Sequence, residues 1–265
     1  MTHHRGRALP VAMAGIGVVA LGLLILVPLA ALVIRAPWRS AGDLLGTEEV
    51  REALGLSLIV SLWALLLAVV LGFPIAWLLA RATFPGRALL RALVLLPMVV
   101  PPVIGGVALL VAFGRRGVVG QHLDDWFDIQ LAYTRTAAVL AATFVSMPFF
   151  VITVEAALRG VDRRYEDAAR SLGASPGFVL RHVTLPSIRG ALGAGAALAW
   201  ARALGEFGAT ITFAGSFAGQ TQTMPLAIYD LLDADVHAAI FLSLVLLAVS
   251  VVVLAGLRDR WLGAP

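Results

Sequence analysis

The chain has 265 residues, of which 60% are hydrophobic and 14% charged, and its mean hydropathy of +0.93 is far above that of a soluble domain. It contains no cysteine and no lysine, which excludes disulfides, thiolate metal sites, Schiff-base chemistry and the lysine-dependent phosphate-binding loop. This composition, with a formal net charge of +4 that is carried by arginine, predicts an all-α membrane protein.

Six apolar runs are each long enough to cross roughly 30 Å of hydrocarbon as a helix at about 1.5 Å per residue. The first run exceeds the apolar region of a secretion signal, which has about 7 to 15 residues, so it is expected to persist as a span. The six predicted spans form a single membrane domain over residues 1–265 and are 11–34, 55–80, 89–113, 134–158, 188–213 and 237–257.

Prolines interrupt the third predicted span. Pro97, Pro101 and Pro102 remove backbone donors there, and Gly105 and Gly106 follow directly. Irregular backbone at membrane depth is tolerated where it is buried in protein or lines a cavity. Pro101, Pro102 and Gly105 are therefore predicted to line a pathway; the alternative is a kinked helix that only packs against its neighbours.

The loop at 159–187 interrupts the apolar sequence with a short polar helix. Asp162 is a good N-cap, because its carboxylate can accept a hydrogen bond from a free backbone N–H of the first turn. The helix is predicted over 163–172. Gly173 is expected to end it in the left-handed conformation that glycine adopts without strain.

A second short helix is predicted directly after that turn. Ser175 and Pro176 are typical of an N-cap and a first helical residue. Pro186 disfavours helix at Leu185, so it is expected to separate this piece from the fifth span.

The first helix of the loop has an apolar stripe. Tyr165, Ala168, Ala169 and Leu172 follow the i, i+3, i+4, i+7 spacing of one helix face, and charged residues cover the rest. Two alanines at the centre of the stripe would let another surface approach the helix backbone closely. The stripe is consistent with docking into a groove, or with a solvated connector that rests on the protein's own helix ends.

The fifth predicted span carries two charges. Arg202 and Glu206 lie four residues apart on one face, and an unbroken helix from Ile188 would place Glu206 near the outer side of the membrane. Intramembrane charges are costly, so they usually pair or face a polar cavity. Arg202, Glu206 and Thr210 are predicted to belong to the pathway, with the pair ordering an outer gate; the alternative is a purely structural ion pair.

The distribution of arginine predicts the orientation. If the N-terminus is inside, thirteen arginines fall in inner segments and six in outer ones, with Arg202 inside a span. Short cytoplasmic loops carry such an excess. Both termini and the loop at 159–187 are therefore expected to be cytoplasmic, and topology explains the basic balance without a nucleic-acid partner.

The pattern Asp167-Ala168-Ala169, Gly173, Val183 and Leu185-Pro186 resembles the EAA signature of the permease subunits of bacterial ABC importers. The spacing matches throughout, although Asp167 replaces the usual glutamate and Val183 the usual isoleucine. The resemblance implies the six-helix fold of type I (MetI-like) importer permeases and a coupling helix for a cytoplasmic ATPase. The residues that it assigns to coupling are Tyr165, Glu166, Asp167, Ala168, Ala169, Leu172, Gly173, Leu185 and Pro186.

Further stretches resemble the molybdate branch of these permeases: "GFPIAWLLAR" at 72–81, "LLPMVVPPVIGG" at 95–106, "ARALGEFGATITFAG" at 201–215 and "TQTMPLAIY" at 221–229. The stretch at 221–229 favours a permease for molybdate or tungstate. "GEFGA" is shared with sulfate permeases, so the second hypothesis is an importer for sulfate or another oxyanion. A self-sufficient channel or an intramembrane hydrolase is the third. The lack of a convincing Ser/His arrangement opposes the hydrolase, and a coupling loop with nothing to couple opposes the channel.

The resemblance also implies partners. Two copies of the chain would pair with two ATPase subunits in a bacterial cytoplasmic membrane and receive the anion from an extracytoplasmic molybdate-binding protein. ATP and magnesium would be held by the ATPase, so no cofactor and no catalytic residue are expected in this chain. The five histidines show no spacing typical of a metal site.

Overall fold

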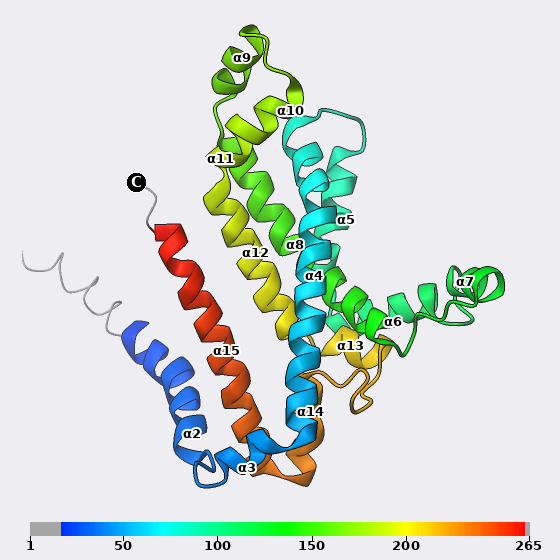
Figure 1. Ribbon diagram of the computed structural model, residues 1–265, viewed down its shortest axis with the longest axis vertical. Helices are drawn as coiled ribbons and strands as arrows, with labels where there is room; N and C mark the ends of the chain where they lie inside the picture. The colour runs from blue at the N-terminus through cyan, green and yellow to red at the C-terminus, as the bar shows by residue number, and fades with distance from the viewer. Residues whose placement is uncertain (1–16, 263–265) are drawn as a thin grey trace, which may run out of the picture.

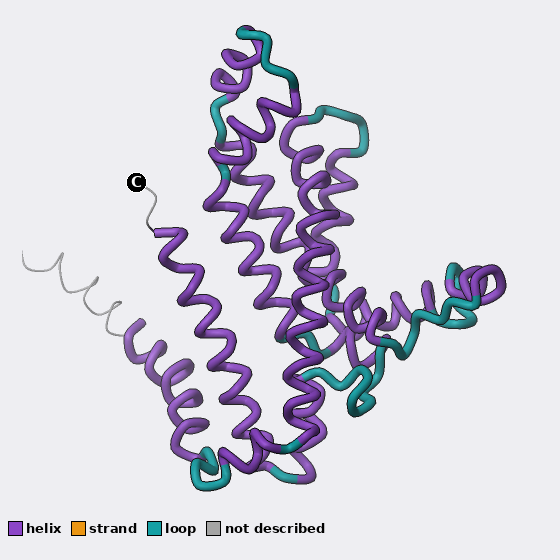
Figure 2. The backbone as a smooth tube through the Cα atoms, in the orientation of Figure 1, coloured by secondary structure: helices purple, strands orange, loops and turns teal. Residues whose placement is uncertain are grey.

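The computed structural model describes residues 17–262, and the regular elements in that range are all helices (Figure 2). In chain order they are η1 Gly22–Leu26, α2 Val27–Arg35, α3 Ala41–Gly46, α4 Glu48–Arg81, α5 Arg87–Val99, α6 Pro102–Phe113, α7 Gly120–Phe127, α8 Arg135–Gly160, α9 Arg163–Ser171, α10 Pro176–Val179, η2 Leu180–Thr184, α11 Leu185–Ser187, α12 Arg189–Leu204, α13 Gly208–Phe213, α14 Met224–Ala234 and α15 Val236–Leu262.

In the described part of the chain, four helices are long and apolar enough to cross a membrane: Gly17–Arg35, Glu48–Arg81, Arg135–Gly160 and Val236–Val253. They correspond to the first, second, fourth and sixth predicted spans. The bent pair α5 and α6 makes a fifth if it is counted as one span. Residues 11–16 of the first prediction lie outside the described part of the chain. The second span is longer than predicted, because α4 begins at Glu48 and continues into the apolar run without a break.

The chain has the irregular backbone predicted within the third span, but the prediction of a single helix over 89–113 was wrong. The chain forms α5 and α6 there, with a bend of 116° between them. Val100 and Pro101 are extended, with ψ angles of 131° and 133°. The physical cause is the pair Pro101-Pro102, since each proline disfavours helix in the residue before it and neither donates a backbone hydrogen bond.

The prediction of one helix over 188–213 was also wrong. α12 ends at Leu204 and α13 begins at Gly208. Phe207 leaves the helical region, with φ −128° and ψ −56°, and the side chain of Glu206 accepts a hydrogen bond from the backbone of Ala209. A carboxylate that caps a new helix start makes the break favourable at this point.

The two broken spans meet, because α6 packs against α13. A Cβ atom on Gly106 would lie 2.7 Å from the carbonyl oxygen of Ala209, and one on Gly208 would lie 3.0 Å from Cβ of Pro102. Only glycine allows the backbones to come this close.

The centre of the bundle is α8, which packs against α4 and α12 (Figure 1). The buried face of its first half consists mainly of small residues, which let neighbouring helices approach closely. Fully buried alanines on this face are Ala137, Ala138, Ala141 and Ala142. Large apolar side chains such as Leu24, Val70 and Val252 are instead exposed, as expected for a surface that faces lipid.

The connecting elements gather at two ends of the bundle (Figure 1). α9, α10 and the loop between α4 and α5 lie at one end, and α3 and α14 lie at the other. α6 and α7 extend sideways from the bundle beside α13. The predicted coupling loop is therefore well separated from the opposite end of the molecule.

Candidate functional site

The first helix of the coupling loop forms as predicted. Asp162 caps α9, its Oδ1 accepting a hydrogen bond from the backbone N–H of Arg164 at 2.9 Å. Gly173 has a φ of +87°, the left-handed conformation expected after the helix. Ser175 caps the second helix, its hydroxyl accepting from the backbone N–H of Phe178 at 3.3 Å. The local sequence is therefore sufficient to define both helix starts and the turn.

The predicted apolar stripe of α9 points away from the bundle. Tyr165 is 67% exposed and Leu172 is 89% exposed, with Ala168 exposed between them and Ala169 partly buried. No other described part of the chain covers this face. Such a face on a helix of nine residues is available to a partner.

Glu166 was assigned to coupling, but sequence reasoning missed that it is buried. It is 3% exposed; its Oε1 accepts hydrogen bonds from Arg81 Nη2 at 2.7 Å and from Thr184 Oγ1 at 2.9 Å. Arg170 Nη2 lies 3.6 Å from the other oxygen. One carboxylate therefore joins α9 to the end of α4 and to η2. No local pattern indicates this contact, because Arg81 is 85 residues away in the sequence.

Asp167, next to Glu166, lies on the exposed side of α9. Its side chain is 67% exposed and forms an ion pair with Arg170 at 3.1 Å. The acidic residue at the start of the EAA-like signature is thus accessible from outside the bundle, whereas its neighbour is the internal anchor.

The expectation that Pro186 ends the second helix was wrong. α10, η2 and α11 form one continuous helical segment over 176–187, and the break comes at Ile188, with φ −108° and ψ 10°. In η2 the N–H of Leu185 bonds to the carbonyl of Leu180, five residues back. This wider π turn accommodates a proline ring without the loss of a regular hydrogen bond.

Arg202 and Glu206 form the predicted pair, with Nη2 and Oε2 2.6 Å apart. Glu206 is 3% exposed, and its other oxygen accepts from the backbone N–H of Ala209 at 2.7 Å. Thr210, on α13, is also buried. Through these two contacts, Glu206 links Arg202 at the end of α12 to the first turn of α13 across the break.

The other predicted pathway residues lie on the opposing break. Pro101 and Pro102 form the turn into α6, and Pro102 contacts the backbone near Gly208. Gly105 instead faces α8, where a Cβ atom would lie 2.8 Å from the ring of Phe144. The structure thus brings Pro102 and the Glu206 region together and places Gly105 at a packing contact.

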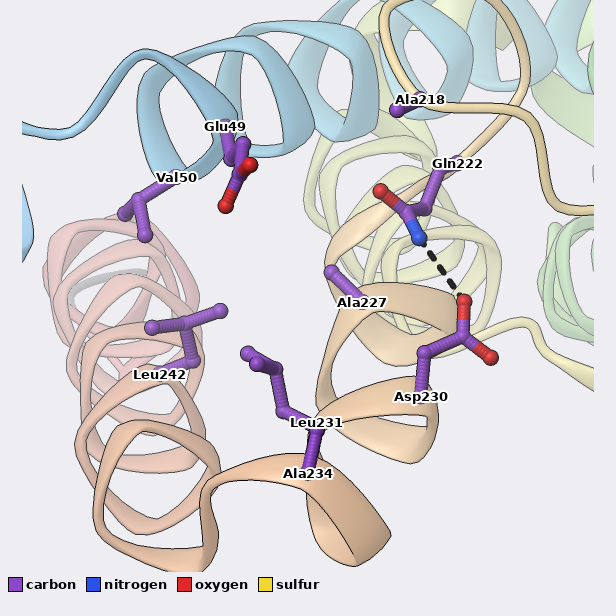
Figure 3. A pocket seen from close by; sticks show the side chains of 9 residues that line it. All are labelled: Glu49, Val50, Ala218, Gln222, Ala227, Asp230, Leu231, Ala234 and Leu242. Atoms are coloured by element: carbon purple, nitrogen blue, oxygen red, sulfur yellow. Dashed lines mark hydrogen bonds between the residues drawn. The ribbon is translucent and has the colours of Figure 1, made fainter.

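A cavity of about 300 Å³ lies between the start of α4, α14 and α15 (Figure 3). Figure 3 shows Glu49 on one side and Asp230 on the other, with Gln222 donating to Asp230 at 2.8 Å. None of the predicted pathway residues lines it. Two carboxylates on its wall disfavour an anion as its occupant.

The sequence model for the inner membrane component of binding-protein-dependent transport systems matches residues 68–263. The chain belongs to this family. This permease family comprises the membrane components of transport systems that receive their cargo from a binding protein, so the exposed face of α9 lies on a transport subunit.

Sequence similarity to other permeases extends over most of the chain. It is 46% identical over 251 residues to the molybdenum transport system permease protein ModB of Mycobacterium bovis, covering 94% of this chain and 92% of that protein. Identity to the Escherichia coli ModB is 43% over 216 residues, covering 82% and 94%. Identity to the sulfate transport system permease protein CysT of Salmonella typhimurium is 39% over 236 residues, covering 88% and 85%.

Solved structures share the fold. A bacterial ABC transporter that imports the acidic polysaccharide alginate superposes with a TM-score of 0.79 at 18% identity, covering 96% of this chain and 94% of that one. The MetNI methionine transporter gives 0.58 at 22% identity, covering 82% and 94%. The fold is therefore that of type I ABC importer permeases, as the EAA-like signature implied.

The buried anchor of α9 can be tested with Glu166→Gln. The amide keeps the shape and can still bond Thr184, but it leaves the guanidinium of Arg81 without its carboxylate, at a cost of about 3 kcal/mol. Hydrogen exchange measured by mass spectrometry is expected to be faster over 163–187. Asp167→Asn, at the exposed neighbouring position, is the matched control and should exchange like the wild type. Equal exchange in both variants would show that the anchor does not hold the helix.

Proposed function

We propose that this chain is the membrane-spanning permease subunit of an ATP-driven importer for molybdate or tungstate. The observation that carries the proposal is the identity of 46% and 43% to two molybdenum permeases along more than four-fifths of the chain. A sulfate importer is the second candidate, supported by 39% identity to a sulfate permease and by the shared "GEFGA" stretch.

The ATPase is a separate chain in this proposal. The permease has no lysine with which to build a phosphate-binding loop, so ATP and magnesium are held by the partner and the permease itself is non-catalytic. The partner docks on α9, where Tyr165, Ala168 and Leu172 present an uncovered face. A groove on the ATPase that accepts an amphipathic helix would bury this face.

The remaining partners follow from the same mechanism. A second copy of the chain completes the pathway, and an extracytoplasmic molybdate-binding protein delivers the anion at the α3 and α14 end. The α9 end faces the cytoplasm, in agreement with the excess of arginine there, and both termini are cytoplasmic. The bilayer is the bacterial cytoplasmic membrane, and no nucleic acid takes part.

Transport proceeds by alternating access. Closure of the ATPase subunits moves α9, and the contacts of Glu166 with Arg81 and Thr184 pass the movement to α4 and η2. η2 leads through α11 into α12, at whose far end Arg202 and Glu206 close the break to α13. The pair orders the outer gate there. Because Glu206 is a carboxylate, it repels the anion and is not its ligand.

The transport proposal is tested by uptake into cells that express this permease with its ATPase and binding protein. Molybdate is expected to accumulate, tungstate to compete strongly, and a tenfold excess of sulfate to compete weakly. Elemental analysis of molybdenum in the cells measures the uptake. Accumulation of sulfate without molybdate would instead establish the second candidate.

Docking of the ATPase is tested with Leu172→Glu. A carboxylate in an apolar groove costs about 2 kcal/mol or more, so co-purification of the ATPase with tagged permease should fall at least about tenfold. Val118→Glu is the control, since Val118 is also highly exposed, at 71%, but lies in the loop before α7. An unchanged yield of ATPase with Leu172→Glu would reject α9 as the docking helix.

The gate is tested with Glu206→Gln. The amide oxygen can still cap α13, so the fold is retained, while the charge that pairs with Arg202 is lost. Uptake is expected to fall about tenfold, which corresponds to about 1.4 kcal/mol. Stimulation of the ATPase by the loaded binding protein should fall with it. Normal uptake together with normal stimulation would leave the pair a purely structural role.

A further inference from the structure

A cavity of about 440 Å³ lies at the start of α5. The start of α5 is at the same end of the bundle as α9 (Figure 1). None of the residues assigned to coupling or to the pathway lines it. Five of its lining residues are on the first turns of α5 and one is near the end of α8: Arg87, Ala88, Arg91, Ala92, Leu95 and Arg159.

Two of the three arginines of this cavity share one carboxylate. Glu155, which is buried, forms an ion pair with Arg91 and another with Arg159, whose Nη2 lies 2.7 Å from its Oε1. Arg87 donates instead to the backbone carbonyl of Leu79 at 2.5 Å, which Arg159 also reaches at 3.3 Å. Among the side chains that the structure describes, no other acid pairs with these arginines. The lining therefore has an excess of two positive charges.

This concentration of positive charge is unfavourable without an anion. Arg87 and Arg91 are like charges at i and i+4 on one helix face, an arrangement that destabilises a helix. α5 also begins at Arg87 with no side-chain cap, so the positive end of the helix dipole adds to the same region. Ala88, Ala92 and Leu95 form the apolar part of the lining.

The geometry suits an anion with several oxygen atoms. Guanidinium groups present paired donors that match oxyanions, and charge-assisted bonds of this kind are stronger than neutral ones. The side chains of Arg91 and Arg159 are 42% and 38% exposed, so their outer donors are reachable from the cavity. A tetrahedral dianion would match both the donors and the excess charge.

The position relates this cavity to the pathway. α5 runs from the cavity to the extended residues Val100 and Pro101, a length of about 20 Å at about 1.5 Å per residue. Beyond them, α6 packs against α13 beside Glu206. One helix thus connects the break between the membrane segments with a positively charged cavity at the coupling end.

We propose that this cavity is a binding site for a tetrahedral oxyanion on the cytoplasmic side, occupied by the cargo as it leaves the pathway. The proposal rests on the proposed transport function for the identity of that cargo. Its physical role is to lower the energy of the anion next to the bilayer, where a dianion is poorly solvated. Phosphate groups of anionic lipids present the same chemistry at this depth, so they are the other source of such a ligand.

Binding is measured on the full-length chain in detergent by equilibrium dialysis against molybdate, followed by elemental analysis. We expect about one molybdate per chain and competition by sulfate. Arg87→Gln, which keeps a donor for the carbonyl of Leu79, should bind at least about tenfold more weakly. Arg189→Gln is the control, because Arg189 lies on the same side at the start of α12 but outside the cavity.

A second pair of variants tests the cavity at Ala92 and leaves Arg87 unchanged. Ala92 is exposed, so a longer side chain fits without disturbing the helix. Ala92→Glu places a negative charge in the cavity and should abolish binding, whereas Ala92→Gln, of the same size, should retain most of it. Thermal unfolding of each variant verifies that the fold is intact.

The two sources of oxyanion give different results. Loss of molybdate binding in Arg87→Gln and Ala92→Glu supports the cargo as ligand. If molybdate does not bind but an anionic phospholipid seen by native mass spectrometry is lost in the same variants, the site stands with lipid phosphate as its ligand. Binding of neither, or equal binding in all variants, overturns the proposal. Normal molybdate uptake without such binding would reject only this site, whereas absent uptake would reject the transport function.

Discussion

Two interrupted membrane segments support each other in this protein, and the arrangement of the bundle depends on that contact. Backbone groups freed by a helix break have no water to bond within a bilayer, so a break must be satisfied by protein. Glu206 satisfies the start of α13, and α6 lies directly against it because Gly106 and Gly208 have no side chains. A short α6 running sideways would be unstable alone and is stabilised by this contact.

Buried charge organises the coupling end in a comparable way. Glu166 and Glu155 each bond arginines from other segments, Arg81 in one case and Arg91 in the other. Breaking such a pair leaves an uncompensated charge, so each pair fixes the relative position of the helices that contribute to it. The end of α4, the start of α5 and the end of α8 are thereby held together next to α9, the proposed docking helix.

The sequence predicted what is determined locally. The cap at Asp162, the left-handed turn at Gly173 and the pairing of Arg202 with Glu206 each depend on residues a few positions apart, and each was confirmed. The break at Pro101-Pro102 was anticipated as irregular backbone, but its 116° bend was not. A bend of that size needs α13 as a surface to pack on, and that surface comes from distant residues.

The failures have the same physical origin. Hydropathy alone describes 188–213 as one apolar run, because neither Gly205 nor Phe207 is polar enough to interrupt the run on a hydropathy scale. The break is caused by the cap from Glu206, which only becomes favourable once the carboxylate is paired and buried. Likewise Pro186 is tolerated because a π turn precedes it, and the buried role of Glu166 depends on Arg81 from the second span.

The uncovered stripe of α9 also bears on how the protein is made. An apolar face in contact with water favours aggregation and attack by proteases. If the ATPase docks on α9 as proposed, Tyr165 and Leu172 are accessible only while that partner is absent, and the permease alone is then shorter-lived than the assembled complex. The same nine-residue helix that would transmit the movement of the ATPase in the complex would also limit the lifetime of permease subunits that have no ATPase bound.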